Sequence, residues 1–323
     1  MDTSSQPRAI IAGIAGQDGS YLAELLVAKG YRVLGFLKQG DDVSRLSAIR
    51  NDIDFEETEL VRKEDIVRWT RLFGPREVYN FAGVSFIPES WEDPYRAFQV
   101  NTLLVAAFLE ALKVHCRGAR FYQASSSEIF GNPPLSPQDE STPHIPVTPY
   151  GVSKLASHLL CGLYRKRYGM FCVSGILYNH ESPRRQEHFV SQKIAKAAAE
   201  ISKGRSEKLT LGNLDARRDW GFAGDFVRGI WLMLQQPAAD DYILATGRAH
   251  SIRDFLDLAF SSVGLRWQEW VETDPSLVRP VDVGLLVGNP SRAKEKLGWE
   301  AKVSFEQLVK MMVDAQLERI KCH

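Results

Sequence analysis

Two short segments of the chain combine residue types that suit proton and hydride transfer. Tyr150 and Lys154 stand four residues apart, a spacing that puts both side chains on one face of a helix, about one turn apart. A lysine ammonium beside a phenol favours the phenolate and lowers a pKa that is about 10 in a free tyrosine. Such a phenol could take the proton of a sugar hydroxyl while hydride leaves the carbon. Because helices carry this spacing by chance, its meaning depends on the surrounding residues.

A hydroxyl and a carboxylate occur about 25 residues earlier, in Ser125-Ser126-Ser127-Glu128. They follow the apolar run 120–125, which we expect to be a central strand, and α/β folds place their chemistry at the carboxyl ends of such strands. A solvated loop acid or a helix cap would look the same in the sequence. We take Ser126, Glu128, Tyr150 and Lys154 as the candidate catalytic residues.

A glycine-rich turn near the amino terminus predicts a dinucleotide site. It follows the apolar run 8–13 and opens a predicted helix at 20–29. Glycines let the backbone approach a pyrophosphate, and a helix amino terminus offers free N–H groups. Its position at the start of a βαβ unit favours a dinucleotide site over a plain turn. The candidate cofactor residues of this turn are Gly13, Ile14, Ala15, Gly16, Gln17, Asp18 and Gly19.

The residues after the second predicted strand, 31–37, bear on which dinucleotide binds. NAD sites usually place an acid at the end of this strand to bond the ribose 2′-hydroxyl. Here Lys38 stands at that position, and the first acid is Asp41. Lys38 and Arg45 could instead contact a 2′-phosphate, although either could be a plain surface charge. The sequence therefore favours NADP over NAD.

The order of predicted elements indicates an α/β fold with a doubly wound parallel sheet of the Rossmann type. Strands are expected at 8–13, 31–37, 77–82, 120–125 and 171–177, and helices at 20–29, 64–73, 94–115 and from Thr148 onward. Beyond residue 178 the alternation loosens, with helices near 189–203, 223–235, 251–262 and 305–320 and a strand at 208–211. We expect residues 1–178 to form the dinucleotide-binding domain. Residues 179–323 should form a smaller C-terminal substrate-binding lobe, with some segments returning to the main sheet.

Composition narrows the class of protein. The 323 residues are 44% hydrophobic and 25% charged, as in ordinary soluble domains. Lys+Arg and Asp+Glu both number 40, so the net charge gives no indication of a nucleic-acid or membrane partner. No apolar run approaches the roughly 20 residues of a membrane span, and residues 1–8 resemble neither a signal peptide nor an anchor. Four widely spaced cysteines fit reduced thiols, so we expect a cytoplasmic protein without a metal site.

Taken together, the motifs resemble the extended short-chain dehydrogenase/reductase family, and within it the GDP-mannose 4,6-dehydratase group. The likeness covers nearly the whole chain, in blocks at 13–22, 122–131, 177–185, 218–225 and 286–290. The segment Asn179-His-Glu-Ser-Pro-Arg184 is specific to this group. The glycine turn and Tyr-x-x-x-Lys belong to the whole superfamily.

The resemblance implies a lyase with an internal redox cycle on a GDP-sugar. Hydride would leave C4 of the hexose for NADP while Tyr150 takes the hydroxyl proton, with Ser126 beside the C4 oxygen. Glu128 would then remove the C5 proton as the C6 hydroxyl departs as water. Hydride returns to C6, which gives a 4-keto-6-deoxy sugar. Epimerases and 4-keto-sugar reductases of this fold do not need that carboxylate, so Glu128 favours elimination over those alternatives.

Further binding residues follow from the resemblance alone. For the cofactor these are Glu59, Leu60, Phe81, Ala82, Gly83, Ser85, Tyr150, Lys154, His180 and Arg185. For the sugar nucleotide they are Ser85, Ser126, Glu128, Asn179, Val190, Lys193, Leu211, Gly212, Arg218 and Arg279. The cations among them suit a diphosphate, although each alone could be an ordinary surface charge.

The chain departs from the resemblance at three places. The group's paired arginines after the second strand are Gln39 and Gly40 here. This difference bears on the choice of NADP as the cofactor and on whether the protein is a homodimer or a homotetramer. The usual Ala-Ala-Gln-Ser is Ala82-Gly-Val-Ser85, so a related sugar nucleotide such as GDP-manno-heptose is an alternative substrate. The usual threonine is Ser126, which keeps the hydroxyl. A non-catalytic NADP-binding protein is a third alternative, which the four intact candidate catalytic residues argue against.

Overall fold

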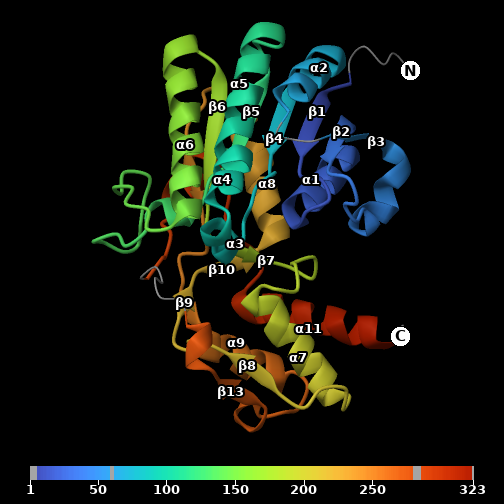
Figure 1. Cartoon of the computed structure of the whole chain (residues 1–323), viewed down its shortest axis with the longest axis vertical. Coiled ribbons are helices and arrows are strands. Elements are labelled where there is room, and N and C mark those ends of the chain that lie inside the picture. The colour runs from blue at the N-terminus through green and yellow to red at the C-terminus, as the bar shows by residue number, and fades with distance from the viewer. Residues whose placement is uncertain (1–5, 59–61, 279–284, 322–323) are drawn as a thin grey trace.

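Figure 1 shows the chain as a computed structural model, which describes residues 6–58, 62–278 and 285–321. A layered α/β unit occupies the upper part of the view, and a smaller lobe of helices and short strands lies below it. The described chain begins in the upper unit and ends in the lower lobe.

The upper unit is built on a seven-stranded sheet in which every strand pairing is parallel. The strand order is β11-β6-β5-β4-β1-β2-β3. Their bounds are β1 Arg8–Ala12, β2 Arg32–Leu37, β3 Ile53–Glu57, β4 Glu77–Asn80, β5 Arg120–Ala124, β6 Phe171–Leu177 and β11 Tyr242–Leu244. The order reverses between β1 and β4, and doubly wound sheets bind ligands at such a switch point. The predicted fold class is confirmed.

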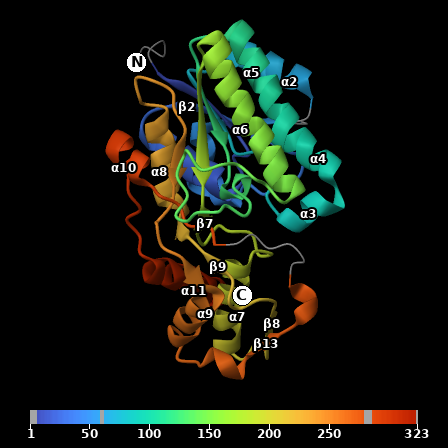
Figure 2. The ribbon, with the colours of Figure 1, turned by 90° about the vertical axis from the view of Figure 1, so that its left-hand side faces the viewer.

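Helices cover both faces of this sheet, as the side view shows (Figure 2). One face carries α1 (Gln17–Ala28), α8 (Ala223–Met233) and α10 (Ser291–Leu297), and the other carries α2 (Lys63–Phe73), α5 (Leu104–His115) and α6 (Pro149–Tyr168). Side chains of β1 alternate between the two faces of the sheet. Ile11 packs against α1 and α8, and Ile10 packs against α2 and α5. Both are fully buried, as expected of a strand covered on two faces.

The predicted helix at 94–115 is interrupted and more apolar than expected. It consists of α4 (Pro94–Phe98), a π-helical turn η2 (Gln99–Leu103) and α5, and α3 (Ile87–Glu92) precedes it. Among the described residues, this one helix is long and apolar enough to cross a membrane by length and composition, contrary to the sequence-based expectation. Leu104, Phe108 and Leu109 are almost fully buried against the sheet, so core packing accounts for its apolar character.

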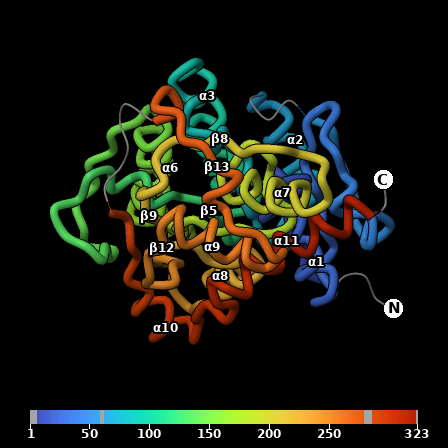
Figure 3. Tube along the Cα trace, turned by 90° about the horizontal axis from the view of Figure 1, so that it is seen from below, coloured from blue at the N-terminus to red at the C-terminus, as the bar shows by residue number. Residues whose placement is uncertain are grey.

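The lower lobe has its own hydrophobic core, and Figure 3 shows the backbone of this lobe from below. Its helices are α7 (Val190–Ser202), α9 (Ile252–Ser261) and α11 (Phe305–Lys321), beside the paired strands β8 (Leu209–Leu211) and β13 (Val271–Thr273). Strands β7 (Asn179–Glu181) and β10 (Trp220–Phe222) pair at the junction with the sheet, and β9 (Arg217–Arg218) pairs with β12 (His250–Ser251). The ring of Trp220 stacks on Phe305 in this core, with centroids 5.7 Å apart.

Two helix starts matter for the site. Thr148 caps α6 by accepting a hydrogen bond from the Gly151 N–H (3.0 Å), and Pro149 follows in the first turn, as expected of a helix start here. In contrast, α1 begins at Gln17 and not at residue 20, so Gln17 and Asp18 belong to its first turn. The remaining short helical turns are η1 (Ser44–Asp52), η3 (Ser127–Ile129), η4 (Trp267–Glu269) and η5 (Pro275–Leu277).

Candidate active site

A cleft of about 910 Å³ lies between the carboxyl ends of the sheet strands and the lower lobe. Its lining comes from the glycine turn before α1, the segments after β4 and β5, the start of α6, strand β7 and the start of α7. This volume is near the upper end of the range for small-molecule sites, as expected where two ligands meet. The four candidate catalytic residues all line this cleft.

The phenol and ammonium of α6 face the end of β5. Tyr150 is 8% exposed and Lys154 is 5% exposed. The Lys154 Nζ donates a hydrogen bond to the Ala124 carbonyl oxygen (2.9 Å) and lies 5.8 Å from the centre of the Tyr150 ring. The Tyr150 hydroxyl is hydrogen-bonded to the Ser126 side chain. Tyr150 and Lys154 of α6 therefore lie beside the residues at the end of β5, at one corner of the cleft.

Burial dominates the proton affinity of this pair. It raises the pKa of Tyr150 to about 12, the Ser126 hydrogen bond opposes that change, and the Glu128 charge adds to it. Burial also lowers the pKa of Lys154 to about 8. The expected lowering of the phenol pKa is therefore wrong for the chain alone, because the ammonium is directed at Ala124 and not at the phenol. Tyr150 is therefore a neutral phenol at pH 7, so it must lose its own proton before it can act as a base.

Glu128 lies in η3, directly after β5. Its N–H donates to the Ser126 hydroxyl (3.2 Å), which caps this short turn. Its carbonyl oxygen approaches α6 so closely that a Cβ on Gly151 would lie 2.7 Å away, so glycine is needed there. Since the Glu128 charge contributes to raising the pKa of Tyr150, its carboxylate is within electrostatic reach of the phenol. The corner thus holds a hydroxyl, a phenol, an ammonium and a carboxylate.

The glycine turn forms a cradle that side chains would fill. Gly13 has φ +80°, in the left-handed region that favours glycine, and a Cβ there would lie 2.9 Å from the Ala82 backbone nitrogen. A Cβ on Gly19 would overlap the Gly13 carbonyl oxygen. Gly16 precedes α1 without a side-chain cap, so the first turn can offer its N–H groups to an anion. This turn fits the pyrophosphate of a dinucleotide.

Comparison with known proteins identifies the family. The GDP-mannose 4,6 dehydratase family model matches residues 10–312. The chain is 45% identical to GDP-mannose 4,6 dehydratase 2 of Arabidopsis thaliana, over 99% of this chain and 90% of that protein. The chain belongs to the GDP-mannose 4,6-dehydratase family. A Yersinia enterocolitica GDP-mannose 4,6-dehydratase is 36% identical over 98% of this chain and 95% of its own length.

Solved structures agree with this family fold. RMD from Pseudomonas aeruginosa, solved with NADPH, has a TM-score of 0.83 at 22% identity, covering 97% of this chain and all of that one (100%). At that identity the likeness concerns the fold. The arrangement of a Rossmann sheet with a smaller lobe is thus shared with a solved structure of low sequence identity.

Most candidate binding residues line the same cleft. On the cofactor side these are Gly13, Ala15, Gly16, Gln17, Asp18, Gly19, Lys38, Phe81, Ala82, Gly83, Ser85, His180 and Arg185. On the sugar-nucleotide side they are Asn179, Val190, Lys193, Leu211, Gly212 and Arg218. Glu59, Leu60 and Arg279 lie outside the described residues.

Ile14 differs from the other residues of the glycine turn, because it does not line the cleft. It is fully buried in the core between the sheet and α1. Its Cδ1 would lie 2.5 Å from a Cβ on Gly35 of β2, so the two residues are closely packed. The Ile14 side chain therefore packs behind the glycine turn, and any contact of this residue with a cofactor, which stays a prediction, would be made by its backbone.

Two predicted cofactor-binding residues, Arg185 and His180, have partners that the sequence does not reveal. The Arg185 Nε is 3.1 Å from Glu181, and its guanidinium lies over the Phe189 ring, 3.5 Å from the ring centre. His180 contacts Asp18 of α1. Both side chains thus join segments around the cleft as well as lining it.

The structure adds residues that the sequence analysis missed. The His188 ring lies between two phenylalanines at the cleft, 4.6 Å from the Phe86 ring centre and 4.4 Å from that of Phe189. This aromatic group links the segment after β4 to the segment before α7. Glu89 and Arg96 also line the cleft. These residues lie in segments without a recognisable motif, so only the spatial arrangement identifies them.

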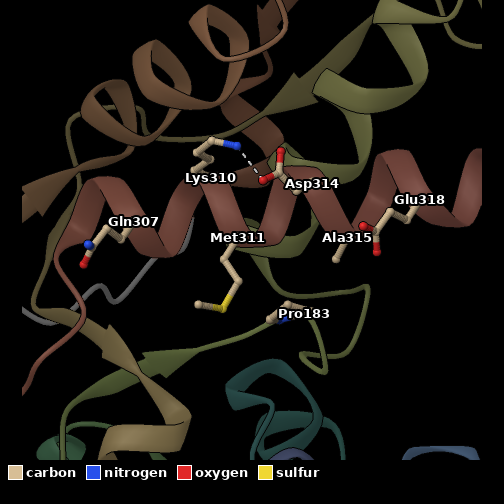
Figure 4. A pocket seen from close by; sticks show the side chains of 7 residues that line it. All are labelled: Pro183, Gln307, Lys310, Met311, Asp314, Ala315 and Glu318. Carbon is tan, nitrogen blue, oxygen red and sulfur yellow. Dashed lines mark hydrogen bonds and ion pairs between the residues drawn. The ribbon is translucent and has the colours of Figure 1, made fainter.

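A second hollow lies on the outer side of α11 and offers no comparable chemistry (Figure 4). Its only residue outside α11 is Pro183, and the Lys310 ammonium is already paired with Asp314 at 2.6 Å. Among the residues described, no group of three or more His, Cys, Asp or Glu could hold a metal ion. The cleft is therefore the candidate active site.

Proposed function

We propose that this protein is a GDP-sugar 4,6-dehydratase that converts GDP-mannose to GDP-4-keto-6-deoxy-mannose, with NADP as its cofactor. The observation that carries the proposal is the carboxylate of Glu128 beside Ser126 and Tyr150 in the cleft. Oxidation at C4 needs one proton acceptor on the protein beside the hydride acceptor, whereas elimination of water also needs a base for the C5 proton. Family membership supports the same reaction.

Bound NADP would supply a hydride acceptor that later returns the hydride, held by the glycine turn and by the residues beside Lys154. The protein's own part is proton movement. Once its own proton has passed to solvent, Tyr150 takes the C4 hydroxyl proton beside Ser126, while Lys154 holds positive charge nearby. The new ketone acidifies the C5 proton, which Glu128 removes and passes to the departing C6 hydroxyl, so that this group leaves as water. Each positioned acid or base contributes about 10²- to 10⁴-fold in rate.

The lower lobe supplies the cations for a nucleoside diphosphate. Lys193 of α7 is exposed and Arg218 of β9 is half-buried, and both line the cleft opposite the sheet. Arginine suits bidentate phosphate contact, and lysine adds a point charge. We infer that these residues bind the diphosphate, while the main sheet and α6 carry the chemistry.

A panel of nucleotide sugars tests the proposal. GDP-mannose, GDP-manno-heptose, UDP-glucose and dTDP-glucose would be incubated with the purified protein, and mass spectrometry would score loss of water. GDP-mannose is expected to react, with GDP-manno-heptose as the alternative because Gly83-Val84 alters the segment near the sugar. Gly83 itself is confined, since a Cβ there would lie 2.7 Å from the Asn101 side-chain oxygen. Reaction of neither GDP-sugar would refute the proposal.

The 2′-phosphate end of the cleft yields a prediction on cofactor choice. The Asp41 carboxylate accepts the Lys38 N–H (2.9 Å), so it is engaged within its own loop, while Arg45 reaches Ala15 of the glycine turn (3.1 Å). Removing both cations in Lys38→Ala/Arg45→Ala should weaken NADP binding tenfold or more and leave NAD nearly unchanged. A charge-assisted hydrogen bond is worth about 1.5–3 kcal/mol, or roughly tenfold to over a hundredfold in affinity. Calorimetric titration of both cofactors measures the effect.

The matched control is Arg71→Ala on α2, which removes an exposed cation outside the cleft lining and should alter neither affinity. The single variants separate the two cations, and we expect Arg45→Ala to have the larger effect. The Lys38 side chain is 63% exposed and its ammonium is 3.9 Å from Asp41. Solvent screening and the nearby carboxylate both weaken the electrostatic attraction of Lys38 to a phosphate. An equal loss for NADP and NAD would show that the 2′-phosphate is not recognised here.

We also infer that the protein self-associates, as a homodimer or a homotetramer. Three leucines on neighbouring elements of one face are well exposed: Leu103 of η2 (61%) and Leu159 and Leu163 of α6 (51% and 61%). A second copy is the partner that fits, because Val152 (41% exposed) lies on the same face of α6 and extends the apolar stripe. The free cysteines among the described residues suit a cytoplasmic location.

Charging this face should reduce the solution mass. Leu159→Glu/Leu163→Glu is expected to give a monomer, because two carboxylates would have to be desolvated in the interface. Light scattering after size exclusion measures the mass. Leu72→Glu on α2, where the leucine is 57% exposed, is the matched control and should keep the wild-type mass. A wild-type mass for the double variant would mean that this face is not the interface.

A further inference from the structure

A buried imidazole connects the lower lobe to the glycine turn. His180 lies in β7, the first strand after the sheet strand β6, and its side chain is only 12% exposed. Its Nδ1 is 2.7 Å from the Tyr178 carbonyl oxygen, and its Nε2 is 2.9 Å from an Asp18 carboxylate oxygen. The Phe226 ring stacks near-parallel on the imidazole, with centroids 4.8 Å apart.

The partners of the two ring nitrogens define the protonation state. A carbonyl oxygen can only accept, so Nδ1 must carry a hydrogen. An ionised carboxylate can also only accept, so Nε2 must carry one too, and an imidazole with two N–H groups is a cation. Asp18 is well placed to stay ionised, because it lies in the first turn of α1 and its other oxygen accepts a hydrogen bond from Gln17 (3.1 Å).

We propose that His180 is a positioning residue, protonated at neutral pH, that neutralises Asp18 inside the dinucleotide site and couples cofactor affinity to its own proton. Without this cation, an acid in the first turn of α1 would oppose the pyrophosphate that the same turn is shaped to bind. The inference rests on the proposed function, because it needs an anionic cofactor in this turn.

Other charges around the pair do not replace His180. Arg185 after β7 opposes protonation of the imidazole, but its guanidinium is paired with Glu181. Lys154 and Tyr150 of α6 both interact electrostatically with Asp18, and Lys154 is committed to Ala124. Although burial disfavours the cation, the Asp18 charge and hydrogen bond raise the pKa of His180 overall and lower the pKa of Asp18.

Neighbouring contacts keep the two elements together and supply a control. The Gln17 amide donates to the His180 carbonyl oxygen (3.0 Å) and accepts from the Ser182 hydroxyl (2.8 Å). Arg184 forms an ion pair with Glu24 of α1 at 2.6 Å, outside the cleft lining. Glu24→Gln therefore removes a contact between the same segments without changing charge in the site.

The sign of the pH dependence follows from the raised pKa of His180. The cation is fully present at low pH and is lost as pH rises through that pKa, so NADP affinity should fall on the alkaline side. Wild type should lose about tenfold in affinity across this step, the effect of one charge-assisted hydrogen bond. His180→Gln should bind about tenfold more weakly at pH 7, with a flatter pH profile, whereas Glu24→Gln should follow wild type.

The test combines calorimetric titration of NADP between pH 6 and 10 with ¹⁵N NMR of the imidazole nitrogens in the cofactor-free protein. At pH 7 the NMR should report both His180 nitrogens protonated, and Asp18→Asn should lower the pH at which that signal titrates. Two observations would overturn the inference: a neutral His180 tautomer at pH 7, or identical pH profiles for wild type and His180→Gln. If wild type bound no NADP, the cofactor assignment would fail instead, and the NMR would still decide the charge of His180.

Discussion

Replacing Tyr150 with phenylalanine should lower turnover about 10²- to 10⁴-fold, the usual contribution of a positioned acid or base. The substitution keeps the ring that fills this corner and removes only the hydroxyl that is bonded to Ser126. Because the phenol moves a proton at C4, the loss should appear in kcat, with NADP affinity close to wild type. Steady-state assay of product formation and calorimetry on the same preparation measure both quantities.

A matched control is Tyr164→Phe, which removes a phenol from the same helix outside the cleft lining. It should retain near-wild-type turnover, since its hydroxyl interacts with Glu110 and not with the site. Near-wild-type turnover of Tyr150→Phe itself would mean that another group moves the C4 proton.

Glu128→Gln should separate oxidation from elimination. The amide keeps the shape of the side chain but cannot accept the C5 proton, so we expect the first hydride transfer to survive and water loss to fall about 10²- to 10⁴-fold. In stopped flow, the absorbance band of reduced nicotinamide should appear and persist. Wild type should show only a transient band, because the hydride returns to the sugar.

Glu89→Gln is the comparison variant for this experiment, because it changes another glutamate that lines the cleft. We expect it to retain water loss, since it lies in α3 and not in the turn after β5. Product formation by Glu128→Gln at the wild-type rate would remove Glu128 from the mechanism.

Local signals were sufficient to predict the elements that carry the chemistry. Thr148 is a helix cap and Pro149 is a first-turn residue, and both mark a helix start in the sequence. That start determines where Tyr150 and Lys154 lie on α6. The glycine turn is similarly visible, because its position between an apolar run and a helix needs no tertiary information. The start of α1 was misplaced by three residues (17 against 20), since Gly16 provides no side-chain cap to mark it.

Features that depend on contacts between distant segments could not be predicted. The edge strand β3 (Ile53–Glu57) is rich in acids, and β11 (Tyr242–Leu244) has three residues, so neither has a clear period of alternation. Asp18 and His180 are 162 residues apart, and only the docking of β7 on α1 brings them together. The raised pKa of Tyr150 also comes from burial, which the helical spacing of Tyr150 and Lys154 does not report.

Labelled substrate tests the internal hydride cycle most directly. GDP-mannose carrying deuterium at C4 would be incubated with the purified protein, and the product would be analysed by mass spectrometry and NMR. The account predicts a product that has lost one water and carries the deuterium at C6, because the hydride removed at C4 returns to the carbon that lost its hydroxyl. Deuterium retained at C4, in a product that has lost no water, would contradict elimination and indicate epimerisation.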